Sequence, residues 1–287
     1  MTEYITRFAP SPTGPLHLGH AYSALLAHDL ARAAGGKFLL RIEDIDTTRS
    51  RPYWEDQIYD DLTWLGITWD EPPMRQSDRL SEYQRALHAL WDRCLLYPCT
   101  CTRRDIADAT SAPQEGAEPA FGPDGLIYPG TCREETDRTS RFPQSEALRL
   151  DMQDALSAAD HPEYCYTESA SGHDAKICTQ SRAMVNEVGD IVLSRRDFLG
   201  SYHLSVVLDD AAQGITHVIR GKDIQPATQI HVLLQRLLNL PTPTYHHHRL
   251  IRDENGKRLA KRDDARAIST YRTEGKTPED IRQMIGL

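Results

Sequence analysis

The order of elements expected in the first 42 residues restricts the fold more than any other feature of this sequence. Residues 6–9 predict a short strand, and the apolar-periodic stretch 16–34 predicts a helix that ends at Gly35 and Gly36. Residues 37–42 predict a second strand. Two strands joined through a helix form a parallel pair, and ligands of such sheets bind beyond the carboxyl ends of the strands. The sequence therefore predicts an α/β fold with a binding site after these strands.

Hydrophobic patterns predict further elements along the chain. Helices are expected over residues 52–65, 80–96 and 226–240, and strands over residues 190–193, 204–208 and 216–220. Residues 110–125 are rich in Pro, Gly, Ala and acidic residues, which favours a surface loop.

Composition limits the possible partners and compartment. The 287 residues are 39% hydrophobic, enough for a sizeable core in one large or two smaller domains. The net charge of −9 provides no global attraction for nucleic acid, so an RNA partner needs a local patch. Candidates for that patch are Arg103, Arg104, Arg195 and Arg196. No apolar run approaches the roughly 20 residues that cross a bilayer, and the N-terminus does not look like a signal peptide, so we expect a cytoplasmic protein with no membrane partner.

Two histidines open the first predicted helix. His17 and His20 are three residues apart, so they share one helix face, and Gly19 leaves room for a flat ligand. A helix N-terminus favours phosphate, and imidazoles can stabilise charge that develops on it. Taken alone, the motif is more often an ordinary pair of surface histidines. The basic segment 258–262, far downstream, makes a nucleotide site the better interpretation.

Charged residues follow or end three predicted strands. Arg7, Glu43 and Arg220 would converge at the carboxyl edge of a parallel sheet. An amino acid with an acidic side chain presents two carboxylates and one ammonium, which such a set complements. Each residue taken singly is more often part of a surface ion pair.

The six cysteines favour a reducing compartment, in which clustered thiols indicate metal or chemistry rather than disulfides. Cys99 and Cys101 lie in one turn, and Tyr128 and Cys132 follow in a second, which suits tetrahedral zinc. From the Cys-x-Cys pair alone, zinc and simple burial of the thiols are equally good interpretations. Burial is expected for Cys94, Cys165 and Cys178. The three histidines at 246–248 are expected in a polar strand rather than around a metal, and Trp64 and Trp69 in the core.

Four segments together resemble the class I glutamyl-tRNA synthetases: residues 7–14, 17–20, 41–46 and 258–262. The resemblance covers nearly the whole chain and is weakest between residues 110 and 160. It implies a Rossmann-type parallel sheet with an inserted zinc-containing subdomain and no anticodon-binding domain. The implied division is a first Rossmann half at 1–98, the insertion at 99–189, a second half at 190–245, and at 246–287 the Lys261 loop with terminal helices.

The resemblance also implies roles for individual residues. The ATP site would comprise His17, Gly19, His20, Arg258 and Lys261, of which His17, His20 and Lys261 are catalytic. The glutamate pocket would comprise Arg7, Ala9, Ser11, Glu43, Tyr202 and Arg220. The sequence departs from the family at Ala260, where a serine is usual, and at Val206, where full-length enzymes carry asparagine.

A short subgroup of this family, the glutamyl-queuosine tRNA(Asp) synthetases, resembles the chain in its Cys-x-Cys and Tyr-x-x-x-Cys pairs. It implies structural Zn²⁺ on Cys99, Cys101, Tyr128 and Cys132. It also implies activation of L-glutamate by ATP and Mg²⁺ without tRNA, and transfer to the queuosine base in the anticodon loop of tRNA(Asp), with a monomer as the default. The alternatives are a truncated synthetase charging tRNA(Glu) and a catalytically silent RNA- or zinc-binding module.

Overall fold

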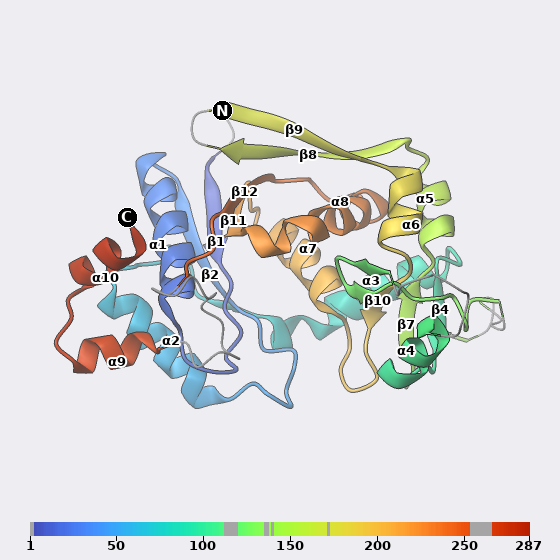
Figure 1. Cartoon of the computed structure of the whole chain (residues 1–287), viewed down its shortest axis with the longest axis horizontal. Coiled ribbons are helices and arrows are strands. Elements are labelled where there is room, and N and C mark those ends of the chain that lie inside the picture. The colour runs from blue at the N-terminus through green and yellow to red at the C-terminus, as the bar shows by residue number, and fades with distance from the viewer. Residues whose placement is uncertain (1–2, 112–119, 135–137, 139–140, 171–172, 253–265) are drawn as a thin grey trace.

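A computed structural model describes residues 3–111, 120–134, 138, 141–170, 173–252 and 266–287. In Figure 1 the N-terminal elements lie at one side of the molecule and a smaller sheet lies at the other. Between them are two helices, α7 and α8, and a long hairpin runs along the top. None of the described helices is long and apolar enough to cross a bilayer.

The predicted strand–helix–strand unit is confirmed. Strand β1 (Ile5–Phe8) pairs in parallel with β2 (Lys37–Ile42), with α1 (Leu18–Ala33) between them in sequence. Strand β2 pairs in turn with the short β3 (Met74–Arg75), after α2 (Pro52–Trp64). Gly36 is required where α1 turns into β2, because an added Cβ would meet the Tyr4 carbonyl oxygen at 1.9 Å.

The second part of the parallel sheet comes from late in the chain. Strand β11 (His217–Gly221) pairs in parallel with β12 (Thr244–His248), and the Thr216 amide donates to the Ile5 carbonyl at 2.9 Å, which joins β11 to β1. Thr228–Leu237 forms α8, preceded by a 3-10 helix over Lys222–Ala227, so the predicted helix 226–240 is confirmed in its central part. The strand predicted at 204–208 is wrong. Those residues belong to α7 (Tyr202–Ala212), which is buried on most of its faces and begins with Ser201 as its N-cap.

A smaller antiparallel sheet stands apart from the parallel one. Its order is β10 (Ile191–Ser194), β7 (Ala147–Leu150) and β4 (Leu96–Cys99). The helix predicted over 80–96 stops early, as α3 (Leu80–Trp91), because the backbone turns left-handed at Cys94 before β4. The other elements here are α4 (Arg103–Ser111), the short strands β5 (Phe121–Gly122) and β6 (Gly125–Leu126), α5 (Met152–Ala159) and α6 (Ser181–Glu187).

A long hairpin extends the sheet of β11 and β12. Strands β8 (Glu163–Ala170) and β9 (His173–Gln180) pair along their whole length, and β8 meets β12 at Glu168 and Tyr245. Cys165 and Cys178 are direct cross-strand partners and form a disulfide. The expectation that Cys94, Cys165 and Cys178 are buried is therefore wrong: Cys94 and Cys178 are exposed, and two of the three thiols pair because the hairpin register places them opposite each other.

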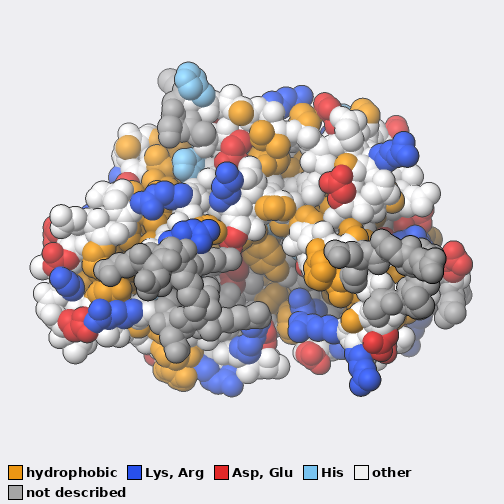
Figure 2. All heavy atoms as spheres, viewed as in Figure 1, with side chains coloured by type: hydrophobic (Ala, Val, Ile, Leu, Met, Phe, Trp, Pro, Cys, Tyr) orange, Lys and Arg blue, Asp and Glu red, His pale blue; other side chains and the backbone are white. Residues whose placement is uncertain are grey.

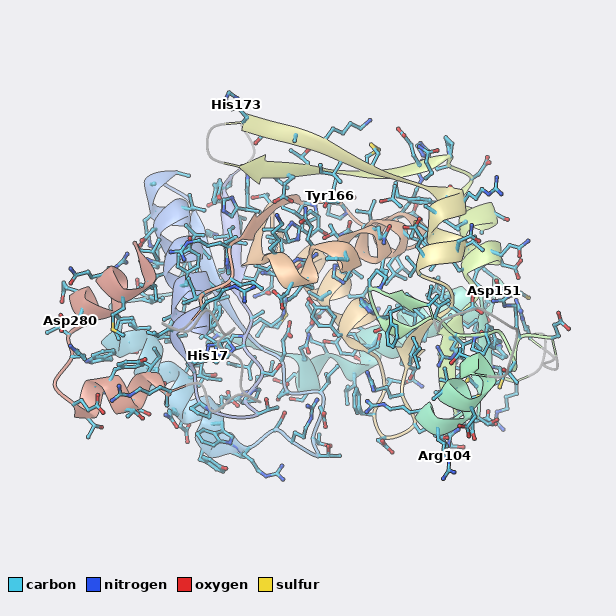
Figure 3. The ribbon with its side chains drawn as sticks, in the orientation of Figure 1. His17, Arg104, Asp151, Tyr166, His173 and Asp280 are labelled. Carbon is cyan, nitrogen blue, oxygen red and sulfur yellow. A yellow bond between two sulfur atoms is a disulfide. The ribbon has the colours of Figure 1, made fainter. Side chains whose placement is uncertain are left out.

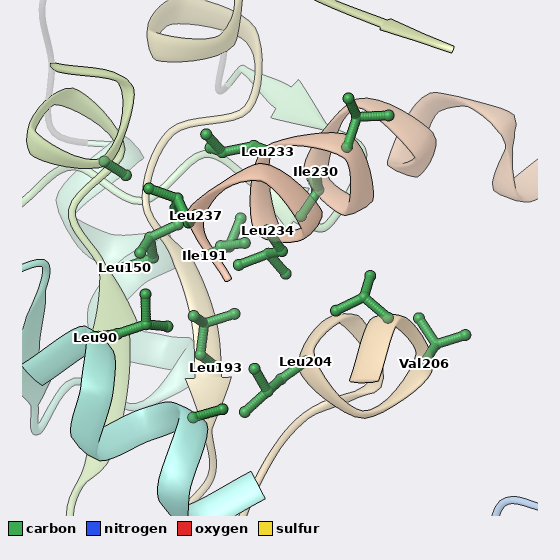
Figure 4. Packing of buried hydrophobic residues seen from close by; sticks show 14 of the residues in the cluster. Leu90, Leu150, Ile191, Leu193, Leu204, Val206, Ile230, Leu233, Leu234 and Leu237 are labelled. Atoms are coloured by element: carbon green, nitrogen blue, oxygen red, sulfur yellow. The ribbon is translucent and has the colours of Figure 1, made fainter. Parts of the chain in front are cut away.

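Two hydrophobic cores support these sheets. In one, α7 and α8 pack on the antiparallel sheet, and Figure 4 shows Leu193, Leu204 and Leu234 converging there. Each such buried leucine contributes about 1.5–3 kcal/mol relative to exposure. The other core lies around α1 and includes Ile268 of α9 (Ile268–Thr273) and Ile281 of α10 (Pro278–Ile285). These cores hold the carboxyl ends of β1, β2 and β11 in a fixed arrangement.

Candidate active site

A cavity of about 930 Å³ opens at the carboxyl ends of β1, β2 and β11, next to the start of α1. It is lined by every described residue that was predicted for the nucleotide and amino-acid sites: Arg7, Ala9, Ser11, His17, Gly19, His20, Glu43, Tyr202 and Arg220. Arg258 and Lys261, predicted for the same site, lie outside the described residues. The described members of both predicted sites therefore lie around one cavity, and their roles there stay predictions.

The two histidines form the start of α1 (His17 is labelled in Figure 3). His17 is the N-cap and its Nδ1 accepts from the Gly19 amide at 3.1 Å, while His20 Nδ1 accepts from the His17 amide at 3.2 Å. The rings stack with centroids 3.8 Å apart. Because each neutral ring uses Nδ1 as an acceptor, each carries its proton on Nε2. Two imidazole donors and a helix N-terminus therefore adjoin one cavity, which is chemistry suited to a phosphate.

Alternating buried charges connect β1, β2 and α7. Arg7 Nε lies 2.9 Å and Arg41 Nη1 2.6 Å from Asp210 Oδ1, and Arg41 Nη2 lies 3.3 Å from Glu43 Oε1. Burial opposes ionisation of Asp210, but Arg7 and Arg41 hold its pKa below the ordinary value. Burial raises the pKa of Glu43, and Arg41 and Arg7 only partly offset this effect. The chain of contacts fixes the Glu43 carboxylate at the cavity wall.

Arg220 differs from Arg7 and Arg41 because its neighbours are uncharged. Its three hydrogen bonds go to His247 Nε2 at 3.1 Å, His231 Nδ1 at 3.1 Å and Thr228 Oγ1 at 2.7 Å. Within the described residues no ion pair reaches Arg220. Arg220 is thus the one of these three buried arginines that no described carboxylate pairs with directly, which leaves its charge available for an anionic ligand.

Tyr202 and Val206 of α7 also line the cavity, one turn apart. Burial raises the pKa of Tyr202, and Arg220 only partly offsets this, so the phenol stays neutral and can donate a hydrogen bond. Val206 offers no hydrogen-bonding group to the cavity. Polar recognition on this side therefore rests on Tyr202 and the arginines.

The predicted zinc ligands come together about the end of β4. Cys101 Sγ lies 3.5 Å from Cys132 Sγ and 3.3 Å from the Tyr128 hydroxyl, and Cys99 Sγ lies 3.5 Å from that hydroxyl. Tetrahedral zinc, with Zn–S of about 2.3 Å and Zn–O of about 2.0 Å, separates its ligand atoms by about 3.5–3.8 Å. The four side chains therefore fit one zinc ion.

The surroundings of this cysteine cluster act differently on its members: burial raises the pKa of Cys101 and of Tyr128, whereas the pKa of Cys132 is lowered. Burial opposes ionisation of Cys132, but hydrogen bonds from Tyr128, the Thr100 backbone and the other two thiols lower its pKa to about 7. Arg149 Nε donates to Cys99 Sγ at 3.2 Å, and its guanidinium lies 3.9 Å over the Tyr128 ring. Arg149 was not predicted, because its strand position gave no signal of this contact.

Arginines surround the open side of the cavity. Arg103 and Arg195, from α4 and the loop after β10, line the cavity itself. Arg104 points away from it (Figure 3) and pairs with Asp108. In Figure 2, Lys and Arg side chains lie around the hollowed middle of this face. Arg103 and Arg195 thus bring positive charge to the cavity, which Asp46 and Asp197 also line, on a chain of net charge −9.

Several residues that support the cavity were missed from the sequence. Asp210, Arg41, Thr228, His231 and His247 act through contacts between distant segments. Arg41 stands inside residues 41–46, which carry the family resemblance, and this was the one available signal. His246–His248 do form a strand, as predicted, and alternation along it sends His247 toward Arg220 and His248 toward Ser23, at 2.8 Å.

Comparison with known proteins agrees with this geometry. The family of tRNA synthetases class I (E and Q), catalytic domain, matches residues 3–287, so the chain belongs to that family and is a ligase of the aminoacyl-tRNA synthetase type. In particular, it is 61% identical to the glutamyl-Q tRNA(Asp) synthetase of Rhodobacter capsulatus, over 99% of this chain and 100% of that protein. The glutamyl-Q tRNA(Asp) synthetase of Nocardia farcinica is 41% identical, over 96% of this chain and 81% of the other.

Solved structures show the same fold. A glutamate tRNA ligase from Elizabethkingia meningosepticum, in complex with its amino acid, superposes with a TM-score of 0.74 at 27% identity. The match covers 99% of this chain, which spans 60% of that one. The methionyl-tRNA synthetase of Mycobacterium tuberculosis shares the fold alone, with a TM-score of 0.57 at 11% identity.

Proposed function

We propose that this enzyme activates L-glutamate with ATP, without tRNA, and transfers the glutamyl group to the queuosine base in the anticodon loop of tRNA(Asp). The observation that carries the proposal is the single cavity that adjoins both the His17–His20 helix start and the Arg7, Glu43 and Arg220 cluster. The names of the relatives at 61% and 41% identity support the acceptor. Because ATP and tRNA are cytoplasmic substrates, we propose that compartment.

The glutamate end uses charged side chains of both signs at the cavity wall. Glu43 accepts from the α-ammonium, and Arg7, Arg220 and the Tyr202 hydroxyl bind the carboxylates, with Ala9 and Ser11 completing the wall. Arg220 is the stronger carboxylate ligand, because Asp210 already neutralises Arg7 while the partners of Arg220 are neutral. The charge of Arg220, which no described carboxylate pairs with, favours the side-chain carboxylate of glutamate over the neutral amide of glutamine.

The ATP end stabilises charge at the α-phosphate. A glutamate α-carboxylate oxygen attacks this phosphorus and pyrophosphate leaves, forming glutamyl adenylate. His17 and His20 donate from Nε2 to the phosphate oxygens as negative charge develops, beside the start of α1 and Gly19. Arg258 and Lys261 are proposed to bind the triphosphate from the other side. Mg²⁺ bound to ATP supplies further charge neutralisation.

The second step attaches glutamate to RNA. A hydroxyl of the queuosine ring attacks the adenylate carbonyl, and AMP leaves. Arg103 and Arg195 at the cavity wall are suited to hold the anticodon loop by its phosphates, which phosphate-binding arginines do without reading sequence. Positioning alone accelerates such a transfer strongly.

The experiment that tests this function is glutamate-dependent exchange between ATP and pyrophosphate in the absence of tRNA. Exchange with glutamate but not glutamine is expected. No exchange would favour the catalytically silent module. Acceptor assays then compare tRNA(Asp) carrying queuosine, tRNA(Asp) lacking it, and tRNA(Glu). Labelled glutamate should be transferred only to the first, and transfer to tRNA(Glu) would identify a synthetase for that tRNA instead.

We propose a structural zinc ion on Cys99, Cys101, Tyr128 and Cys132, in a subdomain inserted into the Rossmann-type fold. Purified protein should contain about one zinc per chain by elemental analysis, and Cys101→Ser should lower that content. Cys94→Ser is the matched control, because Cys94 is exposed and outside the cluster. Removal of zinc by a chelator should lower the melting temperature. Equal zinc content in both variants would contradict the assignment.

A further inference from the structure

The Arg220 guanidinium is held by neutral side chains whose hydrogen bonds define their protonation. Arg220 is 5% exposed, stacks 5.0 Å over the Tyr245 ring and donates to His247, His231 and Thr228. Of its five N–H groups, three are therefore used by described residues. An arginine fixed in this way presents its remaining donors to the cavity in one orientation.

We propose that His247 and His231 are positioning residues for the amino-acid substrate: each accepts a hydrogen bond from Arg220 in one fixed tautomer and thereby aims the guanidinium at the substrate carboxylate. This inference rests on the proposed function, since it assumes that Arg220 binds glutamate. Neither histidine is among the residues that line the cavity. Their effect on the substrate is exerted through Arg220.

One chain of contacts runs from Arg220 to the long hairpin. Arginine can only donate, so His247 Nε2 is the acceptor and the proton of this neutral ring is on Nδ1. His247 Nδ1 lies 2.6 Å from Glu168 Oε2, which accepts that proton's hydrogen bond. Glu168 Oε1 also accepts from the His247 amide at 2.8 Å. A carboxylate on β8 thus fixes both the ring and the backbone of His247.

A second series of hydrogen bonds leads from Arg220 to Asp124. His231 Nδ1 accepts from Arg220, so its proton is on Nε2, 3.2 Å from His203 Nδ1. His203 Nε2 then lies 3.2 Å from Asp124 Oδ1. Both chains end on a carboxylate, and the two histidines that touch Arg220 have opposite tautomers. His231 is 1% exposed, and the His247 side chain is also 1% exposed.

The charges around both rings keep them neutral. Burial and the charge of Arg220 lower the pKa of His247 to about 4, although Glu168 acts in the opposite direction; His246 adds a small lowering effect. Burial and Arg220 also lower the pKa of His231 well below the ordinary value, and His203, Arg7 and His247 act in the same direction. The acceptor nitrogens are therefore available near neutral pH.

Substitution by amides separates positioning from simple packing. The amide of Gln overlaps Nε2 of histidine and that of Asn overlaps Nδ1. His247→Gln and His231→Asn keep an acceptor for Arg220, whereas His247→Asn and His231→Gln remove it. We expect the KM for glutamate, from ATP–pyrophosphate exchange, to stay within about threefold of the unmodified enzyme for the first pair. It should rise about tenfold or more for the second pair, the size expected for a lost charge-assisted hydrogen bond.

The decisive result is that Gln gives the lower KM for glutamate at position 247 and Asn gives the lower KM at position 231. A loss of packing alone would not reverse the order of Asn and Gln between the two positions. The KM for ATP should be unchanged in all four variants. If the four variants share one KM for glutamate while the unmodified enzyme exchanges normally, the positioning role is wrong and the proposed function stands. If the unmodified enzyme does not exchange with glutamate at all, the proposed function fails, and this inference with it.

A second measurement does not depend on variants folding. In the unmodified full chain, ¹⁵N NMR of labelled histidines reports which ring nitrogen carries the proton. We expect the Nδ1–H tautomer for His247 and the Nε2–H tautomer for His231. A single shared tautomer, or protonation of both nitrogens of either ring near neutral pH, would overturn the arrangement.

Discussion

Asp61 shows how one buried group can cost stability in this fold. It lies on α2, is 2% exposed, and its Oδ2 has no hydrogen-bond partner among the described residues. Burial raises its pKa to about 6 from 3.8, with Arg272 offsetting only part of the effect. In the unfolded chain the carboxyl ionises near pH 3.8. The free energy of unfolding therefore loses a contribution as pH rises from about 4 to 6, and this loss persists above pH 6.

Asp61→Asn should stabilise the protein at pH 8 by about 1–2 kcal/mol and have little effect near pH 4, because it removes the desolvated charge. The check is denaturant unfolding at both pH values. Asp60→Asn, the exposed neighbour on the same helix, is the control and should change stability by less than about 0.5 kcal/mol. An equal gain for Asp61→Asn at both pH values would show that ionisation is not the cause.

Individual site residues were predictable where the sequence itself marks them. Glu43 directly follows a strand and Arg7 and Arg220 lie within strands, so a parallel sheet brings them together at one edge. Asp210 and His231 could not be predicted in the same way. Each is on a buried helix face, and its role depends on which helix packs against which strand, a question that local periodicity leaves open.

The start of α1 combines a structural and a proposed catalytic role in one side chain. His17→Asn keeps an N-cap acceptor but removes the imidazole donor, so the free energy of unfolding should change by less than about 0.5 kcal/mol. The rate of ATP–pyrophosphate exchange should fall by roughly a hundredfold, as for loss of one transition-state donor. Thermal unfolding and exchange kinetics on the same preparation provide the two measurements.

His17→Ala is the companion variant, because it removes both the cap and the donor. It should lower stability by about 1 kcal/mol beyond His17→Asn while showing a similar loss of exchange. If His17→Asn retained full exchange, the ring would have no role beyond capping the helix.

Helices and strands could be predicted where the period of the hydrophobic residues agreed with the residues that mark the ends of an element. The strands and helix of residues 5–42 have both, and the expected bounds are close to the observed ones. The strand predicted at 204–208 was wrong because a short apolar run fits a buried helix equally well. Ser201, a strong N-cap residue, was the unused signal. The β8–β9 hairpin was missed because β9 is exposed along nearly its whole length and so lacks an alternation of buried and exposed residues. The domain limits at residues 98, 189 and 245 stay predictions.

For the whole molecule, the distribution of charge should give the two proposed steps, glutamate activation and transfer to tRNA, a different dependence on salt. The net charge of −9 repels RNA, so binding must depend on few arginines around the cavity, such as Arg103 and Arg195. With about three phosphate contacts, the KM for tRNA should rise roughly twenty- to fortyfold between about 50 and 200 mM salt. The KM for glutamate in exchange should change little. Parallel salt titrations of exchange and transfer test this, and an insensitive transfer step would exclude an electrostatic contact.

The contact between Glu168 and His247 connects the β8–β9 hairpin to Arg220 at the cavity wall. If the paired hairpin strengthens the binding of a carboxylate to Arg220, then binding of that carboxylate must stabilise the paired hairpin by the same free energy, because linkage between two equilibria is reciprocal. Saturating glutamate should slow amide hydrogen exchange along β8. This strand begins more than 120 residues after the start of β2 in the sequence. Unchanged exchange there would mean that the pocket and hairpin are energetically independent.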